Sequence, residues 1–199
     1  MLHQARLSLG GPADPADETD EEEYLSDGVL PDSQKTPVTI VTGFLGSGKT
    51  TLINHILKEK HGRKIAVIEN EFGSIDIDSS LLQANAQLAA KEDVITMDNG
   101  CVCCTVRGDL IHAFDMLSRR KDKYDAVVLE TTGLADPAPV AFTFNTQPEV
   151  GSRYKIDAIL CVADCKHIQQ HLNDQREEGV INEAVNQVAF ADKILNPNP

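Results

Sequence analysis

The sequence predicts an α/β fold with a mainly parallel sheet and helices on both faces. From Pro37 onward, short β-branched apolar runs alternate with segments of helical periodicity, and a glycine-rich loop joins the first run to the first helix. Hydrophobic residues make up 41% of the 199-residue chain, enough for a domain with a core of its own. Because aromatic residues are only 5% and Trp is absent, aliphatic side chains must fill that core.

The predicted elements follow one another along the chain with few interruptions. Each strand is a short apolar run of the kind that is buried on both faces of a parallel sheet. In the first helix, Leu52, Ile53, Ile56 and Leu57 share one face, and Gly62 ends the pattern. The predicted strands are 37–43, 64–70, 94–100, 124–133 and 154–164, and the predicted helices are 49–62, 79–93, 107–121 and 181–195, the last running into an incipient strand.

The first 35 residues differ in composition from the rest. The formal net charge of the chain is −13, and the first 34 residues contribute −8 of it, since nine carboxylates there oppose Arg6 alone. Such acidity without apolar periodicity predicts a disordered tail over 1–35, either a solvated segment or a docking peptide. The net charge also argues against nucleic acid as a main partner.

The sequence favours a reducing compartment. No apolar run approaches the roughly 20 residues of a membrane span, so no membrane partner is predicted. The start "MLHQARLSLGG" lacks the apolar core of a secretory signal. Five cysteines, three of them clustered, do not resemble a disulfide framework. The expected location is the cytoplasm, with an organelle stroma or matrix as the alternative.

The segment "GFLGSGKTT", from Gly43 to Thr51, matches the phosphate-binding pattern G-x-x-x-x-G-K-T between a predicted strand and a predicted helix. Inward-facing backbone N–H groups and the dipole at the helix N-terminus suit phosphate oxygens. Lys49 is expected to contact the β- and γ-phosphates, and Thr50 to ligate Mg²⁺. The motif predicts the P-loop NTPase fold, with nucleotide bound by Gly43, Gly46, Ser47, Gly48, Lys49, Thr50 and Thr51.

Acidic residues follow two of the other predicted strands. Glu130 ends an apolar run and is the expected Mg²⁺ partner, with a helix cap as the alternative, and Gly133 is placed to sense a γ-phosphate. The segment "VIENEFGSIDID" supplies further carboxylates near Mg²⁺ or the attacking water, although any single one could belong to a solvated loop. These carboxylates are Glu69, Glu71, Asp76 and Asp78, and the predicted catalytic set is Lys49, Glu130 and Asp78.

Cys101, Cys103 and Cys104 form a C-x-C-C cluster. A soft-metal site, a redox pair and unrelated free thiols are the three interpretations. Thiolates suit Zn²⁺ or Cu(I), whereas adjacent cysteines form a disulfide only with strain. Since Zn²⁺ usually takes four ligands, three cysteines leave one position for a carboxylate, a water or an exchanging partner. An open site of this kind favours metal transfer.

Four segments in this order, "GFLGSGKTT", "IENEFG", "NGCVCCTVRGDL" and "LETTGLADP", resemble the CobW family between Pro37 and Asn196. These P-loop GTPases are related to the nickel-insertion GTPases of urease and hydrogenase, and they include zinc-regulated metalloprotein activators. The resemblance implies a GTPase that uses GTP and Mg²⁺, binds Zn²⁺ and delivers it to a client metalloenzyme, with nucleotide state controlling release. A homodimer is a further expected partner.

Two features depart from the family pattern. Ser74 stands where many members carry an acidic residue, which moves the expected fourth zinc ligand to Glu69 or Glu71. The family's guanine-recognition motif Asn-Lys-x-Asp is matched only by Asn196, because the chain reads "LNPNP". The expectation is therefore a domain over 36–199 that lacks its C-terminal part. The alternative function is a nucleotide- and metal-binding regulatory fragment without useful hydrolysis.

A second metal site is conceivable where Cys161 and Cys165 precede His167 and His171. A buried cysteine on a core strand, followed by solvated histidines, is the favoured interpretation.

Overall fold

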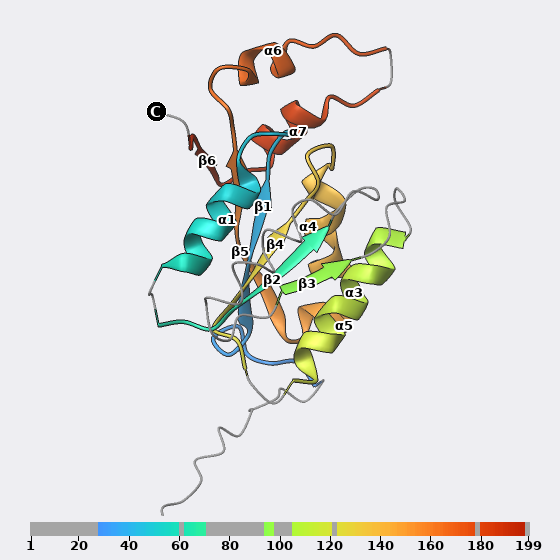
Figure 1. Ribbon diagram of the computed structural model, residues 1–199. Coiled ribbons are helices and arrows are strands. Elements are labelled where there is room, and N and C mark those ends of the chain that lie inside the picture. The colour runs from blue at the N-terminus through green and yellow to red at the C-terminus, as the bar shows by residue number, and fades with distance from the viewer. Residues whose placement is uncertain are drawn as a thin grey trace, which may run out of the picture.

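The computed structural model describes residues 28–59, 62–70, 94–97, 105–120, 123–177 and 180–197. Within these residues six strands form one sheet in the order β3-β2-β4-β1-β5-β6, and every neighbouring pair is parallel (Figure 1). The strands are β1 (Thr36–Thr42), β2 (Ile65–Asn70), β3 (Val94–Met97), β4 (Ala126–Glu130), β5 (Tyr154–Val162) and β6 (Lys193–Leu195). The helices are α1 (Lys49–Lys58), α3 (Thr105–Ser118), α4 (Pro137–Thr146), α5 (Pro148–Gly151), α6 (Ile168–Leu172) and α7 (Glu183–Ala189).

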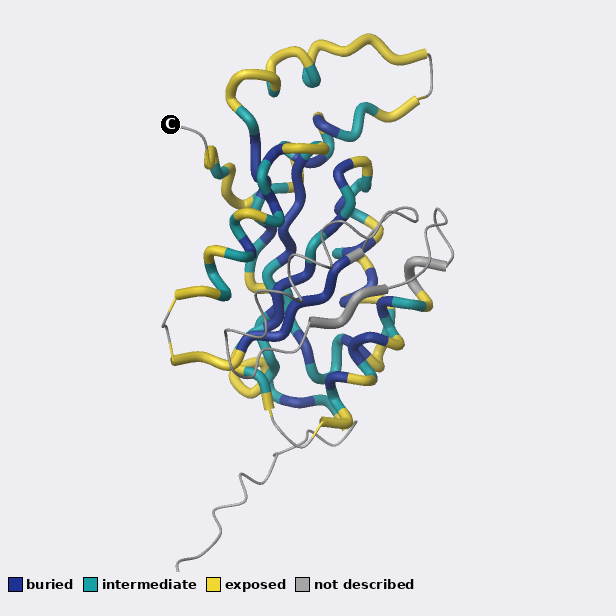
Figure 2. Tube along the Cα trace, in the orientation of Figure 1, coloured by how far each residue is buried: buried dark blue, intermediate teal, exposed yellow. Residues whose placement is uncertain are grey.

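Helices cover both faces of the sheet, as predicted. Side chains alternate between the two faces with a period of two, so neighbouring residues of one strand enter different clusters. On one face Val41 and Val67 pack with Ile53 of α1. On the other face Ile40 and Ile68 belong to a larger cluster with α3, α4 and α5. The strands are therefore buried on both sides, while the outward surfaces of the helices are exposed (Figure 2).

The predicted strands agree with the structure to within a few residues. The helix predicted to run into an incipient strand over 181–195 is confirmed: α7 begins after the Asn182 cap, and the short strand β6 follows it. The helix predicted over 79–93 lies outside the described residues.

Helices α4 and α5 were not predicted, although the start of α4 carries a recognisable signal. Asp136 is the N-cap of α4, and its side chain accepts a hydrogen bond from the backbone N–H of Ala138 at 2.9 Å. Pro137 occupies the first helical position, where proline is favoured because no backbone donor is lost. Pro137 and Pro148 therefore begin α4 and α5, and Pro139 lies within the first turn of α4.

The predicted tail over 1–35 extends too far toward the sheet. Leu30 is buried, and its backbone N–H donates to the Ser152 carbonyl at 2.9 Å. The ordered part of the chain therefore begins before residue 36, because the apolar pair Val29–Leu30 interrupts the acidic stretch. The rest of the predicted tail, residues 1–27, lies outside the described residues.

Tyr154, the first residue of β5, contacts helix α3 inside the larger cluster. Its hydroxyl donates to the Phe114 carbonyl at 3.2 Å, and the two rings lie 4.6 Å apart. Burial raises the pKa of the Tyr154 phenol to about 12.

We expect Tyr154→Phe to lower the free energy of unfolding by about 1 kcal/mol at neutral pH, because one buried hydrogen bond is lost. The raised pKa gives the wild type an advantage that is complete below the unfolded tyrosine pKa of about 10 and is lost as pH rises through about 12. Denaturant unfolding at pH 7 and across pH 9–12 measures both effects. Tyr124→Phe is the control, since that hydroxyl lies in an exposed contact with Arg120. Equal behaviour of the two variants would contradict the prediction.

Candidate nucleotide-binding site

Parallel strands direct all their carboxyl ends to one edge of the sheet, where ligands of open α/β folds bind. Gly43 follows β1, Thr131 follows β4 and Asn196 follows β6 at this edge. The described candidate site residues, which lie far apart in the sequence, are therefore gathered at the carboxyl edge.

The loop between β1 and α1 has the backbone that the glycine pattern predicts. Gly43, Gly46 and Gly48 all have positive φ angles, of 142°, 76° and 98°. A Cβ atom on Gly43 would collide with the Val162 carbonyl oxygen of β5. Gly43 therefore permits both the turn and the close approach of the loop to the neighbouring strand.

Lys49 begins α1 and is only 7% exposed. Its ammonium group folds back across the loop and donates to the Gly43 carbonyl at 2.9 Å and to the Phe44 carbonyl at 3.4 Å. Burial lowers the pKa of Lys49, while the Glu130 carboxylate and Cys161 act in the opposite direction. The loop thus has a buried cationic group at its centre, the group that phosphate oxygens require.

Thr50 and Glu130 meet beside this loop. The Thr50 hydroxyl donates to Glu130 Oε1 at 3.3 Å. Glu130 reaches this position because β4 pairs directly with β1, with Val41 and Glu130 in register. The alternative that Glu130 caps a helix is wrong, since Asp136 caps α4. A hydroxyl and a carboxylate side by side are the hard oxygen ligands that Mg²⁺ prefers.

Glu69 brings a second carboxylate to the same part of the sheet. It is 3% exposed at the end of β2 and lies in register with Glu130 on the neighbouring strand. Alternation from Ile65 and Val67 places Glu69 on the face that α1 covers. Two carboxylates at adjacent register positions repel each other, and a divalent cation between or beside them would relieve that repulsion.

The loop after β4 lies directly against the phosphate-binding loop. A Cβ atom on Gly133 would come within 2.6 Å of the backbone nitrogen of Leu45, so only glycine permits this approach. The backbone N–H of Thr131 donates to the Val41 carbonyl at 2.9 Å, which continues the pairing of β4 with β1. Gly133 therefore lies against the phosphate-binding loop, and its role in sensing a γ-phosphate stays a prediction.

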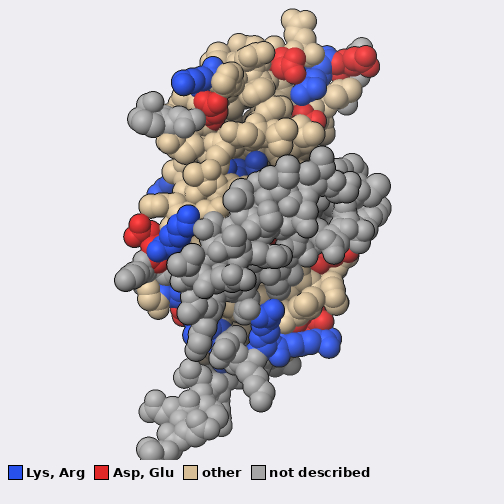
Figure 3. Space-filling model, viewed as in Figure 1, with Lys and Arg blue, Asp and Glu red and all other residues tan. Residues whose placement is uncertain are grey.

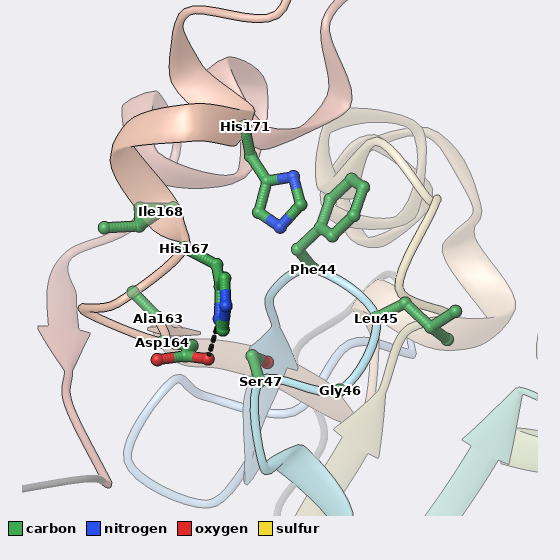
Figure 4. A pocket seen from close by; sticks show the side chains of 9 residues that line it. All are labelled: Phe44, Leu45, Gly46, Ser47, Ala163, Asp164, His167, Ile168 and His171. Carbon is green, nitrogen blue, oxygen red and sulfur yellow. Dashed lines mark hydrogen bonds and ion pairs between the residues drawn. The ribbon is translucent and has the colours of Figure 1, made fainter.

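A pocket of about 350 Å³ separates the phosphate-binding loop from α6 (Figure 4). The His171 ring stacks on Phe44 with centroids 3.9 Å apart, and His167 Nδ1 lies 2.6 Å from Asp164 Oδ2. This hydrogen bond, followed by that from the Lys166 backbone N–H, lowers the pKa of Asp164. His167 is exposed as expected, whereas His171 is half-buried because its ring has an aromatic partner distant in sequence.

The conceivable second metal site is not supported in the described part of the chain. No group of three or more His, Cys, Asp or Glu side chains there could hold a metal ion. Cys161 is buried on β5, as the favoured interpretation predicted, and Cys165 is exposed. Burial raises the pKa of the Cys161 thiol, and nearby Lys49 opposes that rise.

The structure describes some of the remaining predicted site residues and not others. Asn196 is exposed just after β6, and the ring of the following Pro197 would lie 3.2 Å from a Cβ atom on Gly48. Thr51 is exposed on α1, whereas Ser47 is buried, with no hydrogen-bond partner for its hydroxyl among the described residues. Several candidates lie outside the described residues, namely Glu71, Asp76, Asp78, Cys101, Cys103 and Cys104.

Polar contacts from α7 were missed by the sequence analysis. Gln187 donates to the carbonyls of Gly133 and Ala135 at 3.0 and 3.1 Å, and Asn186 donates to Asp136 at 3.1 Å. Periodicity predicted the helix, but nothing in the sequence indicates which loop its amides contact.

Surface charge near these helices is mixed. On the face shown in Figure 3, basic and acidic side chains are interspersed over the described surface around α6 and α7. No helix in the described part of the chain is long and apolar enough to cross a membrane.

In this fold a glycine-rich loop with a buried lysine joins strand β1 of a parallel sheet to helix α1. This arrangement defines a nucleotide-binding protein of the P-loop class. Residues 37–196 match the nucleotide-binding domain of the CobW/HypB/UreG family. The chain belongs to this family, which confirms the predicted resemblance.

The chain spans about half the length of the curated relatives it matches. The chain is 40% identical over 181 residues to zinc-regulated GTPase metalloprotein activator 1 of Schizosaccharomyces pombe, covering 88% of this chain and 43% of that protein. It is 40% identical over 162 residues to the zinc chaperone YjiA of Escherichia coli, covering 79% and 48%. The crystal structure of Zn(II)-bound YjiA GTPase from Escherichia coli superposes with a TM-score of 0.56 at 31% identity, covering 80% of this chain and 48% of that one.

Proposed function

We propose that this chain is the GTP-binding and GTP-hydrolysing domain of a metallochaperone that binds zinc and delivers it to a client metalloprotein. The observation that carries the proposal is the meeting of Lys49, Thr50 and Glu130 at the phosphate-binding loop. Membership of the CobW/HypB/UreG family and the zinc-related names of its relatives support it.

The loop fits a nucleotide triphosphate in chemistry as well as in pattern. Lys49 offers a buried ammonium group whose present acceptors are two carbonyls of the loop itself. The buried Ser47 hydroxyl has no partner among the described residues, so it has a hydrogen bond to offer a phosphate oxygen. The start of α1 adds the positive end of the helix dipole.

The neighbouring oxygens fit Mg²⁺. Thr50 and Glu130 would hold the ion, which would neutralise negative charge on the phosphates of the nucleotide. In the proposed hydrolysis Lys49 holds the β- and γ-phosphates in place. Glu130 and Asp78, the latter outside the described residues, are proposed to orient the attacking water and the metal.

Zinc is proposed as the cargo, held by Cys101, Cys103 and Cys104 with Glu69, Glu71 or a water as the fourth ligand. These cysteines lie outside the described residues, in the segment that joins β3 to α3. That segment leaves β3 at Met97, which is in register with Asn70 at the end of β2. The support is this shared edge: the cysteine segment starts beside the strand that ends in Glu69–Asn70.

A nucleotide- and metal-binding regulator without useful turnover is the second candidate. The observation that favours it is Pro197, which stands where the family's guanine motif has lysine and lies beside Gly48 of the loop. The proposal includes two protein partners, a client metalloenzyme and a second copy of this chain in a homodimer. It also includes a reducing location, in the cytoplasm or an organelle.

Hydrolysis separates the two candidates. With excess Mg²⁺ we expect the wild type to release phosphate from GTP, and ATP serves as the second substrate because the guanine motif is incomplete. Thr50→Val should raise the Mg²⁺ concentration for half-maximal turnover about tenfold, since one oxygen ligand is lost. Thr146→Val, the same chemical change at an exposed position on α4 outside the site, is the matched control. Nucleotide binding without turnover in the wild type would favour the regulator, and equal behaviour of the two variants would contradict the Mg²⁺ assignment.

A further inference from the structure

Gln187 on α7 is a buried polar side chain whose amide is directed at one loop. It is 1% exposed, and its Nε2 donates to the Gly133 carbonyl at 3.0 Å and to the Ala135 carbonyl at 3.1 Å. An amide NH₂ has two donors, and both find acceptors here. The two carbonyls belong to the turn in which the Ala135 N–H donates to the Thr132 carbonyl at 3.1 Å.

This turn is held between two parts of the molecule. On one side Gly133 lies so close to Leu45 of the phosphate-binding loop that no Cβ atom would fit. On the other side Gln187 holds its carbonyls. A second amide of α7, that of Asn186, bonds Asp136 at 3.1 Å, which ties the helix to the residue that follows the turn.

Helix α7 also leads to the other end of the site. The chain runs from α7 into β6, whose Leu195 carbonyl accepts from the Ala163 N–H at 2.8 Å. Pro197 then lies beside Gly48 at the start of α1. The segment from α7 to Pro197 therefore lies against two parts of the site: the turn after β4, and Gly48 at the end of the phosphate-binding loop that leads into α1.

We infer that Gln187 is a positioning residue: it sets the place of Gly133 against the phosphate-binding loop and so gives the site its preference for a nucleoside triphosphate over a diphosphate. The inference rests on the proposed function, in which Gly133 lies beside the γ-phosphate. Among the described residues, the Gln187 side chain donates its hydrogen bonds to carbonyls of this turn alone. It acts through the turn.

The physical reason is the cost of an unpaired buried carbonyl. Without the Gln187 donors, the Gly133 and Ala135 carbonyls must find water or another donor, and the turn must shift to reach either. A shift of Gly133 changes the distance between its backbone and the γ-phosphate position, whereas Lys49 bonds the Gly43 and Phe44 carbonyls and none of the carbonyls of this turn. Affinity for the diphosphate, which lacks the γ-phosphate, should therefore be nearly unaffected.

The test compares affinities for GDP and for a non-hydrolysable GTP analogue, both with Mg²⁺, by calorimetry on the full chain. Gln187→Glu keeps the shape of the side chain but replaces both donors with acceptors, and Gln187→Met keeps its length without polar atoms. Gln34→Glu makes the same chemical change at an exposed position outside the site. We expect both Gln187 variants to lose preference for the triphosphate about tenfold relative to wild type, with GDP affinity within about twofold, and the control to match wild type.

Thermal unfolding identifies any variant that fails to fold. If Gln187→Glu does not fold, the nucleotide affinities of Gln187→Met test the inference, because this variant introduces no buried charge. Equal loss of both affinities would show a general structural role and overturn the inference. Unchanged preference in a folded variant would overturn it too, as would a wild type that binds both nucleotides equally well. A wild type that binds neither nucleotide would instead overturn the proposed function, so the two failures are distinguishable.

Discussion

Lys49→Ala is expected to abolish detectable nucleotide binding. The ammonium group is buried in the phosphate-binding loop, and its acceptors there are the Gly43 and Phe44 carbonyls. Hydrogen bonds to charged groups contribute roughly 1.5–3 kcal/mol each, and one ammonium can contact two phosphates. Affinity for GTP or ATP should therefore fall at least about 100-fold, measured by calorimetry with Mg²⁺ present.

Lys58→Ala is the matched control for this prediction. Lys58 lies at the exposed C-terminal end of the same helix, so the variant changes the same net charge away from the loop. Both variants should keep their helix content by circular dichroism. Wild-type affinity in a folded Lys49→Ala protein would show that the loop is not the phosphate site.

The second large effect is expected for zinc. Replacing Cys101, Cys103 and Cys104 together with serine should remove high-affinity zinc binding, because serine hydroxyls are poor ligands for Zn²⁺ compared with thiolates. Competition with a chromophoric chelator measures the affinity. Wild-type affinity should fall as pH drops below neutral, since the thiols must lose protons to bind. Cys165→Ser, an exposed cysteine elsewhere, is the control and should bind zinc as wild type does.

Nucleotide state is expected to change the zinc affinity of the wild type. The cysteine segment leaves the sheet at β3, next to the end of β2, and β2 pairs with β4 ahead of the turn at Gly133. If zinc affinity differs between the GDP and GTP-analogue complexes, zinc must shift nucleotide affinity by the same factor. Equal zinc uptake by the triple variant would exclude the cysteines as the site. Equal affinity in both nucleotide states would leave a zinc site that nucleotide does not control.

Local patterns predicted most of the secondary structure. The apolar runs of β1, β2, β4 and β5 are short, β-branched and bounded by turn residues, so each could be recognised without its neighbours. No helix was predicted over the α4 segment, although the Asp136 cap and Pro137 mark a helix start. The buried Leu30 was missed because a single apolar pair in an acidic stretch has no periodicity to reveal it.

The sequence by itself determined the phosphate-binding loop, because that site is continuous: the turn at Gly43, Lys49 and Thr50 are specified within a few residues by backbone conformation and spacing. Other parts of the site depended on tertiary structure. The pairing of β4 between β1 and β2 brings Glu130 to Thr50 and Glu69 beside Glu130. Tertiary structure also decides the stacking of Phe44 on His171 and the hydrogen bond from Gln187 to the Gly133 carbonyl, since both contacts join segments far apart in sequence. Strand order and the packing of α7 result from burying apolar surface over the whole domain, so no local pattern encodes which distant residues will meet.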